Sequence, residues 1–404
     1  MCGICGYYSY KNKIIKDLPS LIKKMTNTLK HRGPDEEGYF VSNNIALGHR
    51  RLSIIDLEGG KQPIYNEDKT KIIIFNGEIY NYKEIQRDLK IKGHCFTTNS
   101  DTETILHLYE DVGKECVKKL RGMFSFVIYD KKNHSLFAAR DRLGIKPFYY
   151  SFEDGEFIFG SEIKALLAST KISKKIDFES LSDYLTYLYI PAPKSIFSMV
   201  KKLPAGYTLI IENGTMSLSQ YWDIDFSQTK KFTENEWIDI LNNIIYEAVK
   251  LRMISEVPLG GFLSGGVDSS CIIGIMSRLS NTPIITNSIG FKEAAFSELE
   301  YARQISRYFR TNHNEYTVSM NCSEILDKLA WYFDEPFADS SALPTYYVSK
   351  MTRANVTVAL SGDGGDENFA GYRRYYYDKL ENNIRKKIPG FLRKTFIRLF
   401  AQLY

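Results

Sequence analysis

Short apolar runs separated by glycine-containing and polar turns recur through the first half of the chain, and they predict a domain of sheets with a few helices. Leu21–Lys30 has helical periodicity. Runs with the length and the β-branched or aromatic content of strands are Lys71–Phe75, Leu136–Ala139, Phe148–Phe152, Glu156–Gly160 and Thr208–Glu212. We expect the last of these runs to close a first domain of residues 1–211.

The second half of the chain alternates strands and helices. A weakly patterned polar stretch, 212–233, is the expected linker, and a helix at Glu234–Met253 opens a second domain of residues 234–404. Strands are expected at Val257–Leu263, Pro283–Gly290 and Val356–Leu360. Strands that alternate with helices are typical of a doubly wound parallel sheet, in which ligands bind at the carboxyl ends of the strands.

The first of these strands runs into a loop that is suited to phosphate. Its residues are Ser264, Gly265, Gly266, Val267, Asp268, Ser269 and Ser270, and a helical pattern follows. Glycines let backbone N–H groups form a concave anion site, serines add hydroxyl donors, and the helix presents its positive end. Because Asp268 would repel a bare phosphate, we expect Mg²⁺ to lie between this carboxylate and a pyrophosphate. The plainer alternative is a glycine-rich turn.

The third strand ends in a second loop with the same character, and both loops should meet at one edge of the sheet. This loop is Ser361-Gly362-Asp363-Gly364-Gly365-Asp366-Glu367. Two carboxylates that converge there, Asp268 and Asp366, repel each other unless a divalent cation separates them. The sequence therefore predicts a Mg²⁺ site on these two residues.

A second candidate site begins at the N-terminus. If Met1 is removed, Cys2 carries both a thiol and a free α-amine, whose ordinary pKa of about 7.7–8.0 lets it take the thiol proton near neutral pH. One residue would then supply the nucleophile and its base. The alternative for Cys2 taken by itself is a small buried cysteine.

Residues farther along the chain suit the other parts of an amino-acid amide. Arg51 can hold an α-carboxylate in a two-pronged hydrogen bond, while Glu78 and Asp101 can accept from an α-ammonium group. The Asn76 side chain and the Gly77 backbone N–H can donate to the oxyanion that forms when Cys2 attacks the amide carbon. Together these residues predict a site that binds an amino-acid amide and attacks its amide carbon.

These motifs together resemble a known family. Cys2–Gly6, His31–Asp35, the Arg51 run, Asn76–Glu78, Ser100-Asp101 and Ala139–Pro147 are similar to the class II glutamine amidotransferase domain. With the loop at 264–270, which resembles that of the ATP-pyrophosphatases, nearly the whole chain resembles glutamine-dependent asparagine synthetase. The resemblance implies an α-β-β-α sandwich followed by the α/β domain, and ammonia passing from the first site to the second. His31 and Arg32 are either functional or part of a turn.

The resemblance also implies roles in the second domain. Ser264, Gly265, Gly266, Asp268, Ser269, Ser361, Gly362 and Asp366 would bind ATP and its pyrophosphate, and Asp363 would assist formation of an acyl-adenylate. Phe262 and Ile289 would contact adenine, or else are ordinary core residues. The segment Asp334–Ser341 would help to shape the acceptor pocket, or else is a solvated acidic turn. The chain departs from the family pattern at Asn368 and Ala370.

The expected substrates are glutamine, ATP and a carboxylate, with aspartate first and a sugar acid or peptide as the alternative. The excess positive charge lies mostly in the segment from Arg373 onward. The rest of the chain is nearly neutral, and nothing in it indicates nucleic-acid binding. No apolar run reaches the roughly 18–20 residues of a membrane helix, and six scattered cysteines and six histidines show no metal-ligand spacing. We expect a cytoplasmic enzyme with reduced thiols.

The end of the chain adds one more expectation. Family members commonly continue well past Tyr404, whereas here an apolar helical pattern, Phe391–Tyr404, ends the sequence. Its apolar face would seek a partner, as a homodimer or another association. A shortened glutaminase without synthetase activity, or a regulatory partner of a longer relative, is the alternative to a complete enzyme.

Overall fold

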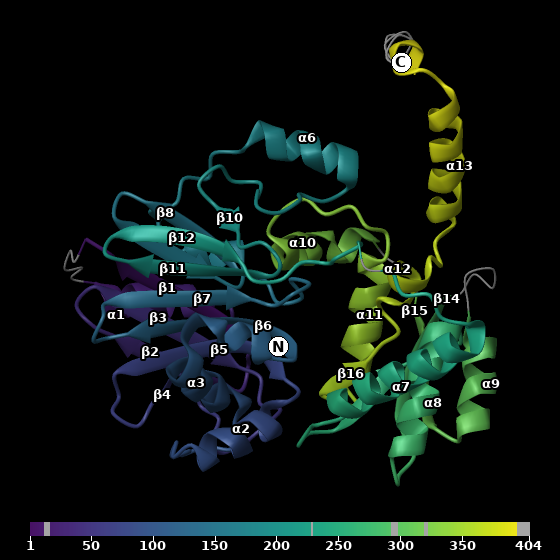
Figure 1. Ribbon diagram of the computed structural model, residues 1–404, viewed down its shortest axis with the longest axis horizontal. Coiled ribbons are helices and arrows are strands. Elements are labelled where there is room, and N and C mark those ends of the chain that lie inside the picture. Colours follow the sequence, from purple (N-terminus) through teal and green to yellow (C-terminus); the bar gives the residue numbers. More distant parts are fainter. Residues whose placement is uncertain (12–16, 228, 292–297, 319–321, 394–404) are drawn as a thin grey trace. The chain divides into compact units, whose positions relative to one another are not determined.

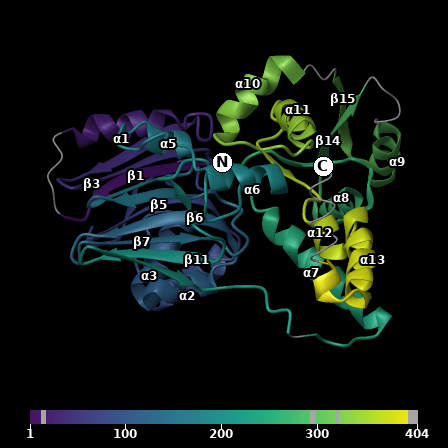
Figure 2. The same cartoon turned by 90° about the horizontal axis from the view of Figure 1, so that it is seen from above.

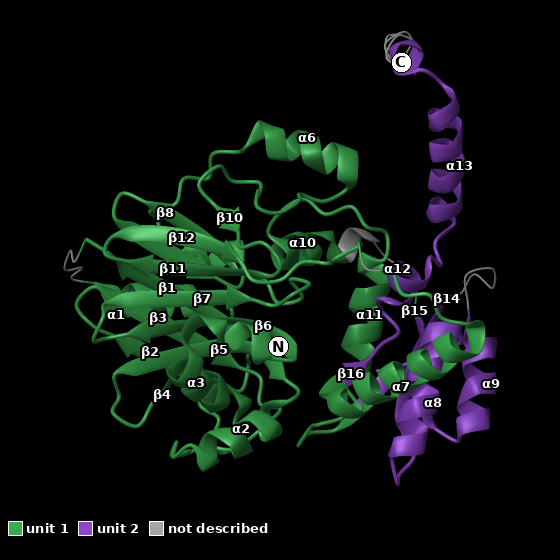
Figure 3. Cartoon of the chain, in the orientation of Figure 1, with its two compact units in different colours: residues 1–259, 318–358 green, residues 260–317, 359–404 purple. Residues whose placement is uncertain are grey.

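The computed structural model describes residues 1–11, 17–227, 229–291, 298–318 and 322–393 (Figure 1). The chain forms two compact units (Figure 3). The first contains Met1–Leu259 and Val318–Val358, and the second contains Gly260–Thr317 and the chain from Ala359 onward. Most of the apolar helix expected at 391–404 lies outside the described residues.

Two six-stranded sheets form the centre of the first unit. The strands of one sheet, in spatial order, are β10 (Lys201–Lys202), β8 (Tyr149–Glu153), β9 (Glu156–Gly160), β1 (Gly3–Ser9), β3 (Ile45–Arg51) and β2 (Glu36–Val41). Those of the other are β12 (Thr215–Gln220), β11 (Tyr207–Glu212), β7 (Ser135–Arg140), β6 (Gly122–Asp130), β5 (Lys71–Ile79) and β4 (Ile64–Tyr65). Neighbouring strands in both sheets run antiparallel.

An apolar core joins the inner faces of these sheets. It includes Ile4, Leu47, Ile74 and Val127, all fully buried. Burial of such side chains contributes roughly 1.5–3 kcal/mol each relative to exposure. β1, which directly follows Cys2, is central in its sheet between β3 and β9, and it is buried along its whole length because its side chains pack into the core on one face and beneath helices on the other.

Helices cover the outer faces of both sheets, and Figure 2 shows the resulting four layers. α1 (Leu18–Asn27) and α5 (Ile163–Leu167) pack on the first sheet, and α2 (Tyr82–Ile91) and α3 (Asp101–Val112) pack on the second. α1 lies close to β3 because Gly48 has no side chain: a Cβ there would overlap the Thr26 hydroxyl. The predicted α-β-β-α sandwich is confirmed.

Further helices complete the first unit: α4 (Cys116–Lys119) after a 3₁₀ turn at Gly113–Glu115, α6 (Phe178–Tyr187), α7 (Glu234–Arg252), α10 (Cys322–Phe333) and α11 (Ala342–Thr352). β12 begins inside the expected linker and pairs along all of β11, so Thr208–Glu212 is not the last strand. α7, expected to open the second domain, belongs to the first compact unit, where Arg121 and Glu247 form an ion pair of 2.7 Å.

The second unit is built on a four-stranded sheet. Its strands are β13 (Leu259–Phe262), β14 (Ile285–Phe291), β15 (Asn312–Val318) and β16 (Val358–Leu360), and they lie in the order β15-β14-β13-β16. β13 and β14 are parallel. The helices are α8 (Val267–Leu279), α9 (Leu299–Phe309), α12 (Gly365–Phe369) and α13 (Arg373–Lys387).

The strand order reverses at β13, as it does in doubly wound α/β folds. The loops that follow β13 and β16 therefore leave the two neighbouring strands at this reversal. Ligands of such folds bind in the crevice at that position. The predicted fold class of this unit is confirmed, and the two glycine-rich loops of the sequence are the ones at the reversal.

No helix within the described part of the chain has the length and apolar content needed to cross a membrane.

Candidate active site

A pocket in the first unit brings together every residue expected to handle glutamine. They come from the N-terminus, the ends of β3 and β5, and the start of α3: Cys2, Arg51, Asn76, Gly77, Glu78 and Asp101 all line it. Gln62, Phe75, Met123 and Lys146 complete much of the wall. The sequence therefore predicted most of the polar groups of one pocket from four separate segments.

Cys2 is held from two directions. Its thiol donates to the Leu52 carbonyl at 3.7 Å, and its own backbone carbonyl accepts from Arg32 Nε at 2.9 Å. Arg32 Nη1 and His31 Nε2 both lie 2.9 Å from Glu162 Oε1. Arg32 thus holds the backbone at Cys2, His31 shares the Glu162 carboxylate with it, and Glu162 is an anchor that the sequence analysis missed.

Burial raises the pKa of the Cys2 thiol, so a nearby base must take its proton for it to react near neutral pH. In the chain as described, Met1 is still joined to Cys2, and the Cys2 nitrogen is an amide without basic character. The buried N-terminal amine belongs to Met1, and desolvation lowers its pKa to about 5. The chemistry expected of Cys2 requires removal of Met1.

The Asn76 side chain is the clearest sign of a ligand in this pocket. It is fully buried, and neither its Nδ2 nor its Oδ1 has a hydrogen-bond partner among the described residues. A buried amide without a partner costs roughly 1–3 kcal/mol, so a group that completes it is expected. At the next position a Cβ on Gly77 would lie 2.8 Å from the Phe124 Cα, which requires glycine there.

Two carboxyl groups face the same space. Burial raises the pKa of Asp101 to about 7, and the Ile79 N–H, which donates to its Oδ2 at 2.9 Å, opposes that shift. Burial also raises the pKa of Glu78, whereas Lys146 lowers it. An incoming ammonium group would favour the charged form of both carboxyls.

Arg51 lies in the pocket wall, but its guanidinium is already engaged. Nη1 donates to Glu36 Oε2 at 2.8 Å and to the Leu57 carbonyl at 3.2 Å. Nη2 donates to the carbonyls of Ile55 and Asp56 at 3.1 and 2.6 Å. A glutamine carboxylate would therefore share these nitrogens with a loop that Arg51 itself organises. The carboxylate-binding role stays a prediction.

Lys146 is a pocket residue that the sequence analysis did not single out. Its side chain is almost fully buried, and burial lowers its pKa to about 8. Its Nζ lies 2.7 Å from Met1 Sδ. Lys146 belongs to the Ala139–Pro147 motif, but nothing in that motif indicates that the lysine is directed inward.

The first loop of the second unit has the local structure expected for an anion site. Gly266 caps α8, and the Ser264 and Ser269 hydroxyls lie 2.9 Å apart. The Ser264 hydroxyl also accepts from the Gly266 N–H at 3.2 Å. Gly265 has φ of +87°, and a Cβ there would lie 2.5 Å from the Tyr301 Cβ. Hydrogen bonds within the loop hold its shape, and only glycine fits at position 265.

The second loop lies against the first. A Cβ on Gly362 would be 2.8 Å from the Ser269 nitrogen and 2.9 Å from the Asp268 Cβ. A Cβ on Gly365 would overlap the Asp268 carboxyl group, and Asp366 follows directly. The structure therefore brings both predicted loops together, with the carboxyl of Asp268 at the contact.

The remaining predicted residues of this unit are placed less specifically. The Ser361 hydroxyl donates to Asp363 Oδ2 at 2.9 Å, and the Asp363 side chain is exposed. Phe262 and Ile289 are half-buried on the neighbouring strands β13 and β14. The nucleotide-binding and metal-binding roles in this unit stay predictions.

The acidic segment Asp334–Ser341 is not a plain solvated turn. Asp334 pairs with Lys164 Nζ at 3.1 Å, and Glu335 pairs with Lys202. Glu335 also accepts from the Ile196 N–H at 3.3 Å. Since all of these groups lie in the first unit, the first carboxylates of the segment join α10 to the loops beyond the sandwich. The predicted acceptor role is left to experiment.

Comparisons with known proteins agree with this arrangement. A glutamine amidotransferase domain model matches residues 1–222, and an asparagine synthase model matches residues 241–403. A protein of Methanocaldococcus jannaschii named putative asparagine synthetase [glutamine-hydrolyzing] 2 is 42% identical over 97% of this chain and 79% of its own length. Asparagine synthetase [glutamine-hydrolyzing] 1 of Bacillus subtilis is 38% identical over 99% of this chain. The chain spans 63% of the length of that relative.

Among solved structures, the glutamine phosphoribosylpyrophosphate amidotransferase of B. subtilis has 14% identity and a TM-score of 0.42, covering 89% of this chain and 81% of that one.

Proposed function

This chain belongs to the family of glutamine-hydrolysing asparagine synthetases, and from that membership we propose that it makes an amide from glutamine, ATP and a carboxylate. Glutamine would be hydrolysed at Cys2, and the ammonia would be used in the second unit. Aspartate is the proposed acceptor, with asparagine, AMP, pyrophosphate and glutamate as products. The name of the 42% identical relative supports this choice of acceptor.

The observation that carries the first half of the proposal is the unpartnered buried amide of Asn76 in the pocket of Cys2. When the thiolate attacks the amide carbon of glutamine, the carbonyl oxygen gains charge, and the Asn76 Nδ2 and the Gly77 N–H are the proposed donors to it. A donor of this kind is worth about 10²–10³ in kcat. Asp101 and Glu78 would accept from the substrate ammonium, and Arg51 would donate to its carboxylate.

Once Met1 is removed, the free α-amine of Cys2 can carry the protons that move in this step. The α-amine of Cys2 accepts the thiol proton as the S–C bond forms, and returns it to the leaving nitrogen as the C–N bond breaks. Ammonia departs and leaves a thioester on Cys2. Water then hydrolyses the thioester to glutamate and restores the thiol. Each proton is thus handled by the nucleophile's own residue.

In the second unit the proposed reaction is adenylation. The acceptor carboxylate attacks the α-phosphorus of ATP and releases pyrophosphate, and ammonia then displaces AMP from the acyl carbon. Ser264, Gly265, Gly266, Ser269, Ser361 and Gly362 are the proposed phosphate contacts, Asp363 assists the acyl transfer, and Phe262 and Ile289 would contact adenine. Two observations at the reversal of strand order support this assignment. The Ser264 and Ser269 hydroxyls hydrogen-bond to each other, and Gly265 and Gly362 have no room for a side chain.

Mg²⁺ would be held by Asp268 and Asp366, and would neutralise the departing pyrophosphate. The donor set fits, because carboxylate oxygens are what Mg²⁺ prefers, and the loop of Asp366 lies against the Asp268 carboxyl group. Because glutamine and ATP are substrates of general metabolism, we propose a cytoplasmic enzyme.

The proposal is tested by supplying ammonium in place of glutamine. Purified protein with ATP, Mg²⁺ and ammonium should release pyrophosphate when aspartate is added, and sugar acids and acidic peptides should not replace it. Stimulation by another carboxylate would assign a different acceptor, and no release with any carboxylate would contradict the synthetase half. Intact-mass analysis should show that the active protein begins at Cys2.

A further inference from the structure

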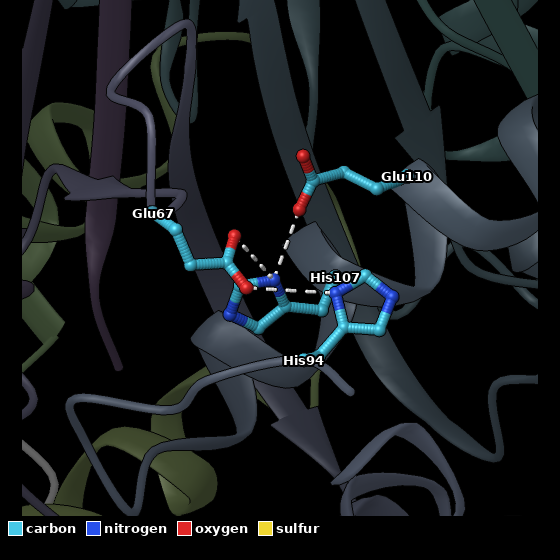
Figure 4. Close-up of side chains that lie close together, drawn as sticks. All are labelled: Glu67, His94, His107 and Glu110. Atoms are coloured by element: carbon cyan, nitrogen blue, oxygen red, sulfur yellow. Dashed lines mark hydrogen bonds and ion pairs between the residues drawn. The ribbon is translucent and has the colours of Figure 1, made fainter. Parts of the chain in front are cut away.

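Two histidines and two glutamates from three segments meet beside the C-terminal half of α3 (Figure 4). His107 and Glu110 lie on α3, Glu67 lies in the turn between β4 and β5, and His94 follows α2. One nitrogen or oxygen from each lies within 4.8 Å of all the others. None of the four lines the Cys2 pocket.

The distances between these atoms are close to those of a metal's ligands. His107 Nδ1 lies 2.9 Å from Glu110 Oε2 and 3.5 Å from Glu67 Oε2. His94 Nδ1 lies 3.6 Å from Glu67 Oε1. Zn²⁺ holds nitrogen and oxygen ligands at about 2.0–2.1 Å, so the corners of its tetrahedron are about 3.3 Å apart. The three contacts above are close to that separation, and the ligand atoms of the four residues all lie within 4.8 Å of one another.

The groups behind the four side chains are those that usually orient metal ligands. His107 is fully buried, and its other nitrogen, Nε2, has no hydrogen-bond partner among the described residues but lies 3.6 Å from Glu103 Oε1. Ligating histidines commonly direct their second nitrogen to a carboxylate in this way. Glu103 is itself fixed, since its carboxylate accepts from the N–H groups of Thr97 and Thr98.

The two glutamates are also oriented by amide donors. Asn66 Nδ2 donates to Glu110 Oε1 at 2.6 Å, and the Cys95 N–H donates to Glu67 Oε1 at 3.1 Å. In each glutamate, the other oxygen then faces His107. The cluster therefore offers two imidazoles and two carboxylate oxygens, each steadied by a neighbour.

We propose that Glu67, His94, His107 and Glu110 bind a structural Zn²⁺ ion. Imidazole nitrogens favour zinc over magnesium, and four protein ligands complete a structural zinc tetrahedron. The ion would join the β4–β5 turn and the segment after α2 to α3, whose first residue is Asp101 of the glutamine pocket. The alternative is that His107 is held by the surrounding carboxylates alone, in which case the cluster would bind no zinc.

Zinc binding to the chelator-treated full chain tests this assignment. Equilibrium dialysis should give one tightly bound Zn²⁺ per chain, in the presence of millimolar Mg²⁺. Because His107 is buried and its replacement could unfold the protein, the test uses the more accessible ligands. His94→Gln and Glu67→Gln should each weaken zinc binding at least tenfold and abolish the rise in Tm that zinc produces.

Matched controls separate this site from other zinc-binding groups. His134→Asn, which changes a histidine outside the cluster, and Cys95→Ser, which changes the thiol next to His94, should leave zinc affinity unchanged. X-ray absorption should show nitrogen and oxygen at about 2.0–2.1 Å and no sulfur at about 2.3 Å. Absence of zinc binding, full affinity in both cluster variants, or a sulfur shell would overturn the proposal.

Discussion

Gly362 and Asp268 lie so close that a Cβ on the glycine would be 2.9 Å from the Cβ of the aspartate. The residues follow different strands of the doubly wound sheet, so their contact joins the two proposed nucleotide loops. Gly362→Ala should therefore separate the loops and lower ATP-dependent pyrophosphate release at least a hundredfold. The glutaminase rate should stay within about twofold of wild type, since its pocket lies wholly in the first unit.

A suitable control for that change is Gly93→Ala, where a Cβ would have no neighbour within 4 Å. Its φ of +99° strains a side chain locally without crowding another residue. Pyrophosphate release that survives in Gly362→Ala would show that the loops need not touch.

Asn76 gives the sharpest prediction for the glutaminase pocket. Its amide is buried without a hydrogen-bond partner among the described residues, so we expect it to bind a group that appears only during the reaction. Asn76→Ala should lower kcat for glutamine hydrolysis by about 10²–10³ and change KM much less. The variant should also unfold at a temperature no lower than wild type, because the alanine removes an unsatisfied polar group. A large rise in KM with unchanged kcat would assign Asn76 to substrate binding alone.

The raised pKa of Asp101 predicts that glutamine binding depends on pH. With a pKa near 7 in the free protein, its carboxyl is mostly neutral below that pH and cannot attract the substrate ammonium. In a Cys2→Ala background, which removes hydrolysis, Kd for glutamine should rise up to about tenfold for each pH unit below 7. Asp101→Asn in the same background should bind glutamine weakly at every pH. A Kd of the Cys2→Ala protein that stays constant between pH 5 and 8 would contradict this role.

The Asp101 carboxyl should lower the stability of the folded protein as the pH rises, whereas the same rise in pH strengthens glutamine binding. The folded protein keeps a proton on Asp101 that the unfolded chain, with an ordinary Asp pKa of about 3.9, releases. Its contribution to stability is therefore lost as pH rises from about 4 to about 7. Thermal unfolding should show Asp101→Asn gaining in Tm relative to wild type as the pH is raised through this range.

Arg51 and Glu36 separate direct binding of glutamine from loop support. Arg51→Lys should raise KM for glutamine by about ten- to a hundredfold, because a charge-assisted hydrogen bond is worth roughly 1.5–3 kcal/mol. Glu36 contacts the same guanidinium at 2.8 Å but does not line the pocket. Glu36→Gln should leave KM within about threefold of wild type. Equal increases in both variants would mean that Arg51 acts through its loop.

Local patterns were enough to predict residues that line one pocket, but not the residues that support them. Cys2, Asn76 and Asp101 were predicted because each has a residue type that the reaction needs, in a short diagnostic context. Glu162 and Lys146 were missed because their roles depend on contacts between distant segments, which only the assembled sandwich supplies.

The boundaries were harder to predict for a related reason. β12 is a short, largely exposed edge strand whose only apolar residues are Met216 and Leu218, and this alternation is too brief to mark a strand by itself. The cluster around His107 was missed because its members come from separate segments. Its members are brought together by the packing of α2, α3 and the β4–β5 turn, which leaves no fixed spacing in the sequence.

The most direct test of the central claim is transfer of the glutamine amide nitrogen to the acceptor. Glutamine labelled with ¹⁵N in the amide should be incubated with the protein, aspartate, ATP and Mg²⁺, and the products followed by mass spectrometry. The account predicts ¹⁵N in the side-chain amide of asparagine, with one AMP and one pyrophosphate formed for each asparagine. Formation of glutamate and ¹⁵N-labelled ammonia, with no ¹⁵N-labelled asparagine and no AMP, would contradict it.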